Sequence, residues 1–109
     1  MKTIIATSAL ALALAASAQA GGMRACGRVT DHRTGYPWYI TANDNTSCSL
    51  ARNVGRAAQY NRDPIVFSPI TGRYYRFACY RSGHTYTYNR YSCISFDGTD
   101  GELKVVMRG

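Results

Sequence analysis

The sequence has few of the residues that commonly act in catalysis, and it has no long apolar run. Its 109 residues include two His and a single Glu, and no G-x-S-x-G segment of the kind that exposes a catalytic serine. No apolar run reaches the roughly 20 residues that cross a bilayer as a helix. A chain this short forms one domain with one small core, which excludes multi-domain enzymes, Rossmann-type nucleotide folds and helical repeat arrays.

The first 20 residues have the order of a secretory signal peptide. Met1 and Lys2 form a basic start, residues 4–16 are mostly apolar, and Ala18-Gln19-Ala20 has the small-x-small pattern of a cleavage site. A retained membrane anchor is the alternative, but the apolar run is short for that purpose. We therefore expect residues 1–20 to be a signal peptide and residues 21–109 to be a single exported, disulfide-stabilised domain.

All four cysteines follow this leader, at positions 26, 48, 79 and 93. An even number of cysteines in a short exported chain predicts two disulfide bonds. No two cysteines are spaced as C-x-x-C, so neither a metal site nor a cofactor is expected. We favour Cys26–Cys48 with Cys79–Cys93. The rival pairing is Cys48–Cys79, because a tight turn at Ser82-Gly83 would separate Cys79 from Cys93 by roughly 23 Å along the partner strand.

The apolar periodicity predicts an α+β fold, with one helix packed on a small antiparallel sheet of about five to six strands. Thr46 or Ser47 is suited to cap a helix that runs from about Cys48 to Tyr60. Alternating or β-branched segments predict strands on both sides of this helix. These segments are residues 26–30, 38–41, 65–68, 73–80, 86–94 and 103–107.

Basic and phenolic residues dominate the predicted surface. The net charge is +7, and the chain has nine Tyr and eleven Arg but only two Lys. Arg binds carboxylates and phosphates through planar donors and stacks on rings, which Lys does less well. If the mixed faces of two neighbouring strands coincide, phenols and guanidiniums share one surface. The candidate binding residues are Tyr74, Arg76, Tyr80, Tyr86, Tyr88 and Arg90, with Arg52 and Arg56 as a second basic patch.

Such a surface predicts a binding module of the cell envelope or extracellular space. Its partner is expected to be an anionic or carbohydrate polymer, or a protein, without specific nucleic-acid recognition or stable membrane insertion. A small ribonuclease-like hydrolase is the alternative, with His32, His84 and Glu102 as its catalytic candidates. A secreted inhibitor or toxin that presents residues 81–85 as a loop is a third possibility. Solubility alone also accounts for a basic, Tyr-rich surface.

Two segments carry a family resemblance. Thr46-Ser47-Cys48-Ser49-Leu50-Ala51-Arg52-Asn53-Val54 matches T-S-C-x-x-A-x-N-V, and Ser68-Pro69-Ile70-Thr71-Gly72-Arg73-Tyr74-Tyr75 matches S-P-x-T-G-x-x-Y, with Cys79 and Cys93 after it. The chain thereby resembles small secreted cysteine-containing proteins of actinobacteria, especially mycobacteria. The resemblance covers residues 26–106 and implies an exported scaffold. This group is largely uncharacterised, so the resemblance brings no catalytic residue.

Overall fold

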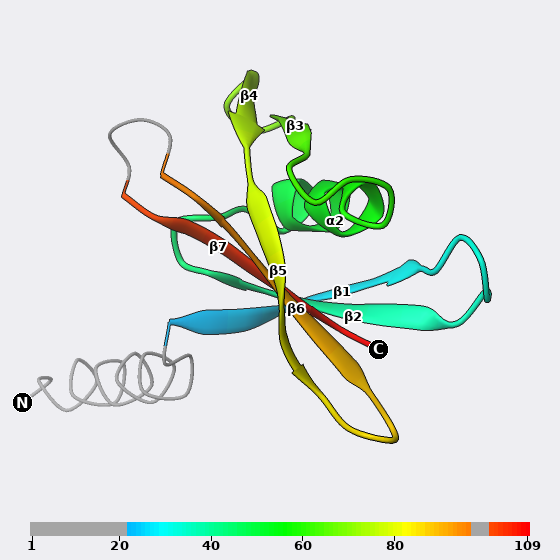
Figure 1. Ribbon diagram of the computed structural model, residues 1–109. Coiled ribbons are helices and arrows are strands. Elements are labelled where there is room, and N and C mark those ends of the chain that lie inside the picture. The colour runs from blue at the N-terminus through cyan, green and yellow to red at the C-terminus, as the bar shows by residue number, and fades with distance from the viewer. Residues whose placement is uncertain (1–21, 97–100) are drawn as a thin grey trace, which may run out of the picture.

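The computed structural model describes residues 22–96 and 101–109, and it has the α+β architecture predicted from the sequence. The described elements are β1 (Met23–Thr30), β2 (Pro37–Asn43), α2 (Cys48–Ala57), β3 (Ile65–Ser68), β4 (Arg73–Arg76), β5 (Ala78–His84), β6 (Asn89–Ser95) and β7 (Leu103–Arg108). A five-stranded antiparallel sheet has the strand order β1-β2-β7-β6-β5, and β3 and β4 form a separate two-stranded sheet. In Figure 1 helix α2 and the small sheet lie on the same side of the large, strongly twisted sheet. The predicted signal peptide lies outside the described residues.

Helix α2 begins where the sequence predicts and packs through a face of small and aliphatic residues. Ser47 is the N-cap, and its side-chain oxygen accepts a hydrogen bond from the backbone N–H of Leu50 at 3.2 Å. Gly55 is buried so close to the sheet that an added Cβ would lie 2.7 Å from Cδ1 of Ile40. The helix ends at Ala57 rather than at the expected Tyr60, because residues 58–60 form a hydrogen-bonded turn.

One face of the large sheet forms the core beneath α2. Ile40 and Ala42 of β2 lie in register with Met107 and Val105 of β7, and Cys93 of β6 is opposite Val105. All five residues are buried. Because side chains alternate across a strand, the residues between them point to the opposite face. That face carries neither α2 nor the small sheet.

The segment predicted as one strand from Arg73 to Tyr80 is two strands. The break falls at Phe77, which is fully buried and whose backbone N–H donates to the carbonyl of Pro64 at 2.9 Å. Strand β4, before the break, pairs with β3, whereas β5, after it, pairs with β6. The alternation of buried and exposed residues continues through the break. The two-residue alternation along the sequence therefore does not indicate that the chain passes from one sheet to the other.

The tight turn expected at Ser82-Gly83 is also wrong. Gly83 pairs with Arg90 inside the β5–β6 ladder, which has an irregularity between Arg81 and Gly83. The chain reverses over residues 85–88, where the N–H of Thr85 donates to the carbonyl of Tyr88 at 2.8 Å. The partner strand accordingly begins at Asn89 and not at residue 86.

This later reversal decides the disulfide pattern. Because the turn is displaced along the chain, Cys79 and Cys93 become direct cross-strand partners with a Cα–Cα distance of 4.0 Å, and they form one bond. The other bond joins Cys26 of β1 to Cys48, the first residue of α2. The nearest-neighbour pairing favoured from the sequence is thus the one observed, and the Cys48–Cys79 rival is wrong.

No helix among residues 22–96 and 101–109 has the length and apolar character needed to cross a bilayer.

Candidate binding face and an adjacent pocket

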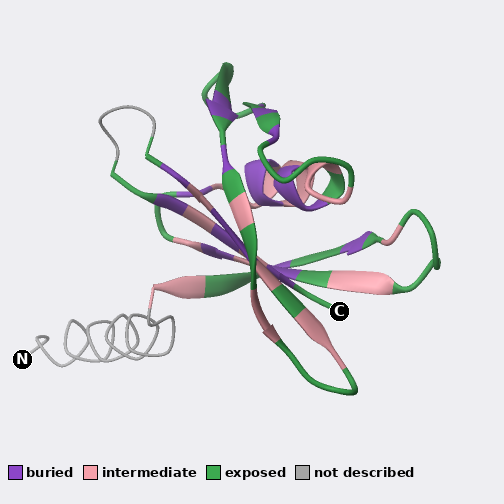
Figure 2. Ribbon diagram, viewed as in Figure 1, coloured by how far each residue is buried: buried purple, intermediate pink, exposed green. Residues whose placement is uncertain are grey.

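The face of the large sheet opposite α2, which we call the uncovered face, carries a row of cationic and aromatic side chains. Arg28, Tyr39, Arg108 and Arg90 follow one another across β1, β2, β7 and β6 as register partners. All four are exposed, Tyr39 by 54%. We call these four residues the arginine row. At the usual strand spacing it extends over about 14 Å. Figure 2 shows buried residues concentrated in α2 and the parts of the sheet near it, with exposed residues toward the strand ends.

The three arginines of the row have no acidic neighbours on the described strands. Arg90 and Arg108 are directly opposite each other, an arrangement that disfavours folding because the two charges are alike. None of the six acidic residues of the chain lies in a described strand. The row therefore creates a positive field that the strands themselves do not neutralise.

Two of the guanidiniums are held in place by neutral partners. Arg90 donates from Nε to the hydroxyl oxygen of Ser82 at 3.2 Å and from its terminal nitrogen to the Ser82 carbonyl at 3.0 Å. The guanidinium of Arg108 lies 4.3 Å from the centre of the Tyr88 ring, which is cation–π geometry. These contacts limit side-chain motion without cancelling charge, so less conformational entropy is lost when an anion binds.

The structure divides the predicted Tyr/Arg surface into separate groups. Tyr80 and Arg90 lie on the uncovered face, Tyr88 adjoins it through Arg108, and Tyr86 is exposed in the 85–88 turn. Tyr74 and Arg76 belong instead to the small sheet, where their register partners are Phe67 and Ile65. These six candidates therefore do not form one continuous sheet face, because the chain changes sheets at Phe77.

The second predicted patch, on α2, is partly occupied by internal contacts. Arg52 donates a hydrogen bond to the carbonyl of Cys26 at 3.0 Å, and Arg56 donates to the side-chain oxygen of Asn53 at 2.9 Å. Arg52 thus connects the helix to β1, and of the pair only Arg56 is exposed.

Sequence reasoning missed Arg28, Tyr39 and Arg108. The alternation in residues 37–43 and 103–108 places Tyr39 and Arg108 on the solvent side of their strands. That alternation was a usable signal. The alternation does not reveal the strand order. This order brings β7 between β2 and β6 and so places the four residues of the row side by side.

The three residues proposed for a hydrolase do not share a site. His84 ends β5, whereas Glu102 directly precedes β7 at the opposite end of the β6–β7 pair, roughly 20 Å away at the usual strand rise. His32 follows β1, at the other edge of the sheet from β5. Residues 81–85, proposed as an inhibitory loop, lie mostly in β5 rather than in a loop.

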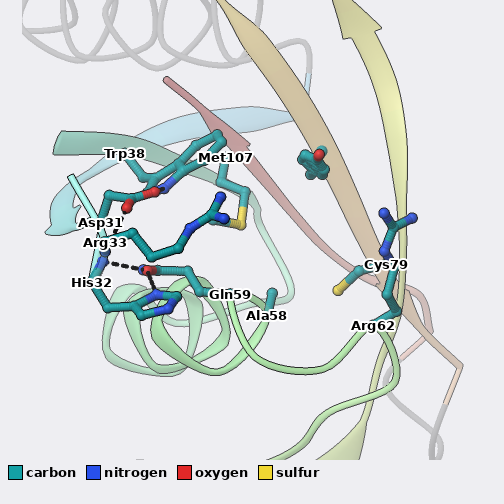
Figure 3. A pocket seen from close by; sticks show the side chains of 10 residues that line it. Asp31, His32, Arg33, Trp38, Ala58, Gln59, Arg62, Cys79 and Met107 are labelled. Atoms are coloured by element: carbon teal, nitrogen blue, oxygen red, sulfur yellow. Dashed lines mark hydrogen bonds between the residues drawn. The ribbon is translucent and has the colours of Figure 1, made fainter. Parts of the chain in front are cut away.

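A small pocket lies on the side of the sheet that faces α2, beside the loop from β1 to β2. Its volume is about 150 Å³, and its lining includes Trp38, Tyr91 and Met107. Figure 3 shows the side chains of Asp31, His32 and Arg33 at one side of it and those of Arg62 and Cys79 at the other. Gln59 lies at its floor, where its side-chain oxygen accepts a hydrogen bond from the backbone N–H of His32 at 2.8 Å.

Asp31 organises the loop that forms this pocket. Its carboxylate accepts hydrogen bonds from the backbone N–H groups of Thr34 and Arg33 at 2.9 and 2.8 Å, and from the indole nitrogen of Trp38 at 2.7 Å. The Thr34 bond, then the Trp38 and Arg33 bonds, lower the pKa of Asp31 from its usual 3.8 to about 2. The carboxylate is therefore ionised at neutral pH and fixes the position of Trp38.

Protonation of Asp31 should lower the folding stability as the pH drops from about 4 to about 2. A lowered pKa in the folded state contributes stability above the unfolded pKa, and this contribution is lost as the pH falls through the folded value. The Asp31→Asn variant should therefore have a lower Tm at neutral pH and a flatter decline of Tm in acid. Asp63→Asn, at another loop acid, is the matched control. If both variants give the same Tm profile as the parent protein, the assigned role of Asp31 is wrong.

Comparison of the chain with protein-family models, with curated proteins and with solved structures finds no match. The resemblance to secreted actinobacterial proteins consequently stays a prediction from the two sequence motifs.

Proposed function

We propose that the protein is an exported binding domain, not an enzyme, that holds an anionic polysaccharide across the uncovered face of its sheet. The observation that carries this proposal is the arginine row, in which three guanidiniums and an exposed phenol are in register on four adjacent strands. Carboxylate and sulfate groups are the natural partners of such donors. The exposed ring of Tyr39 within the row provides a surface on which a sugar ring can stack.

The charge arrangement favours an anionic polymer over a neutral glycan or a protein partner. Placing Arg90 opposite Arg108 costs stability in the free protein, and a bound anion between them would remove that cost. A neutral sugar would leave the repulsion in place. The arginine row also extends across four strands, which suits a chain that lies across the strands better than a compact ligand.

The cysteines support the proposed export of the protein. Both disulfides join elements of the small core, and such bonds persist in oxidising compartments. The leader-like residues 1–20 point to the same location. We place the protein at the cell envelope or outside the cell.

Replacing Arg90 and Arg108 together by Gln should weaken binding to heparin, used as a probe, by about tenfold or more, because charge-assisted contacts are lost. The slope of log Kd against log salt concentration should decrease by the amount that corresponds to about two lost charge contacts. Isothermal titration at several salt concentrations measures both quantities. Arg56→Gln with Arg73→Gln is the matched control, since both residues are exposed, lie off the uncovered face and give the same change in net charge.

The two double variants separate a defined face from general basicity. If both weaken heparin binding equally, net charge alone explains the affinity and the proposed face is wrong. If the parent protein binds a neutral glucan as tightly as heparin, with no salt dependence, the ligand class is wrong. Thermal melts of each variant show whether a loss of binding reflects a loss of folding.

A further inference from the structure

We propose that the pocket beside the β1–β2 loop binds a small aromatic carboxylate. This site lies on the side of the sheet opposite the arginine row, so the inference goes beyond the proposed function and does not depend on it. It rests on three features of the pocket: its size, its aromatic and sulfur-containing walls, and two guanidiniums that have no acidic partner among the described residues.

The size of the pocket limits the ligand to about one ring. Its volume of about 150 Å³ resembles that of protein cavities that accept a single benzene molecule. A nucleotide or a disaccharide is too large for this space. The polymer proposed for the uncovered face therefore cannot be the ligand here.

The walls are suited to a flat apolar ring. The rings of Trp38 and Tyr91 meet edge to face with their centres 5.7 Å apart, and both are half-buried. Met107, which is 3% exposed, and Cys79 add polarizable sulfur to the lining. Aromatic and sulfur groups of this kind make favourable contacts with the faces and edges of another ring.

The charges at the rim favour a carboxylate on that ring. Arg33 and Arg62 reach the pocket from opposite sides (Figure 3), and neither forms an ion pair within the part of the chain that the structure describes. The guanidinium of Arg62 lies 5.7 Å from the centre of the Tyr91 ring, so it is directed along the wall of the pocket. A guanidinium offers two parallel donors to a carboxylate.

Asp31 and Gln59, two other polar residues of the lining, already have partners. Asp31 is occupied by Trp38 and by two backbone N–H groups. The amide nitrogen of Gln59 donates to the carbonyls of Thr30 and Gly55, and its oxygen accepts from His32. Arg33 and Arg62 therefore carry the charged donors that a ligand can recruit, and an anion fits them better than a cation would fit the occupied Asp31.

Trp38 provides a direct readout because it is the sole tryptophan of the chain. Titration of the full exported protein with benzoate should change the fluorescence of Trp38 with a Kd of about 0.1–1 mM, as expected for a ligand of this size. Benzamide, which has the same shape without the charge, should bind at least tenfold more weakly. Acetate, which has the charge without the ring, should also bind at least tenfold more weakly.

Arg62→Gln and Arg33→Gln should each raise the benzoate Kd about tenfold and leave benzamide binding unchanged. Arg73→Gln, the matched control on the small sheet, should leave both constants unchanged. The proposal is overturned if benzoate produces no saturable signal, if benzamide binds as tightly, or if Arg73→Gln weakens benzoate as much as Arg62→Gln does. Since Arg33 and Arg62 lie outside the arginine row, their substitution should not change the heparin Kd, which distinguishes failure at this site from failure of the proposed function.

Discussion

Replacing Cys26 and Cys48 by alanine should lower the free energy of unfolding by about 3 kcal/mol, with an observed range of about 2–5 kcal/mol for small secreted domains. The two residues are 22 positions apart, so the bond closes a substantial loop and restricts the unfolded chain. It also fixes the start of α2 to β1. A domain of this size has a net stability of only about 5–10 kcal/mol, so the variant should lose a large share of it.

Urea unfolding followed by circular dichroism measures this loss. The matched comparison is the alanine pair at Cys79 and Cys93, which opens a loop of 14 residues. Its cost should be similar, about 3 kcal/mol, because loop entropy changes slowly with length. If the Cys26/Cys48 variant unfolds at the same urea concentration as the parent protein, this disulfide does not hold the helix to the sheet in the way inferred here.

Phe77→Ala should cost about 3–5 kcal/mol, the usual penalty for removing a large buried aromatic side chain. Phe77 is fully buried at the point where the chain passes from the small sheet to the large one. Its loss would leave a cavity in the hydrophobic core at this junction. We therefore expect a strong decrease in the urea midpoint, with partial unfolding at ambient temperature.

Phe96→Ala is the matched control for this substitution. The side chain of Phe96 is 76% exposed, so its truncation should change the free energy of unfolding by about 0.5 kcal/mol or less. Equal losses in the two variants would contradict the assignment of Phe77 to the core.

The local elements were largely predictable from the sequence because local rules determine them. The start of α2 follows from a Ser cap and an apolar stripe at helical spacing. Strands β2 and β7 follow from segments rich in aromatic, aliphatic and β-branched residues, and Ile40 and Met107 lie on the buried side. The α+β class follows from one helix among strands. Two disulfides follow from an even number of cysteines.

The incorrect predictions concerned a strand break and a turn, neither of which is specified by local sequence patterns. A period of two residues is the same whether a strand continues in one sheet or enters another, so the break at Phe77 was invisible. Ser82-Gly83 has the composition of a turn, but the irregularity before Gly83 lets the strand continue to His84. Each error moved candidate residues: the first removed Tyr74 and Arg76 from the large sheet, and the second placed Tyr86 and Tyr88 in the reversal.

The sequence by itself determined which residues face a core and which face solvent, because alternation and helical spacing are properties of single segments. Only the tertiary structure decided which solvent-facing residues become neighbours. The arginine row exists because β7, the last strand in the chain, lies between β2 and β6, and the pocket exists because the loop after β1 meets the end of α2. Both depend on contacts between segments far apart in the chain, and the energy of those contacts comes from burial of the whole core rather than from any single segment.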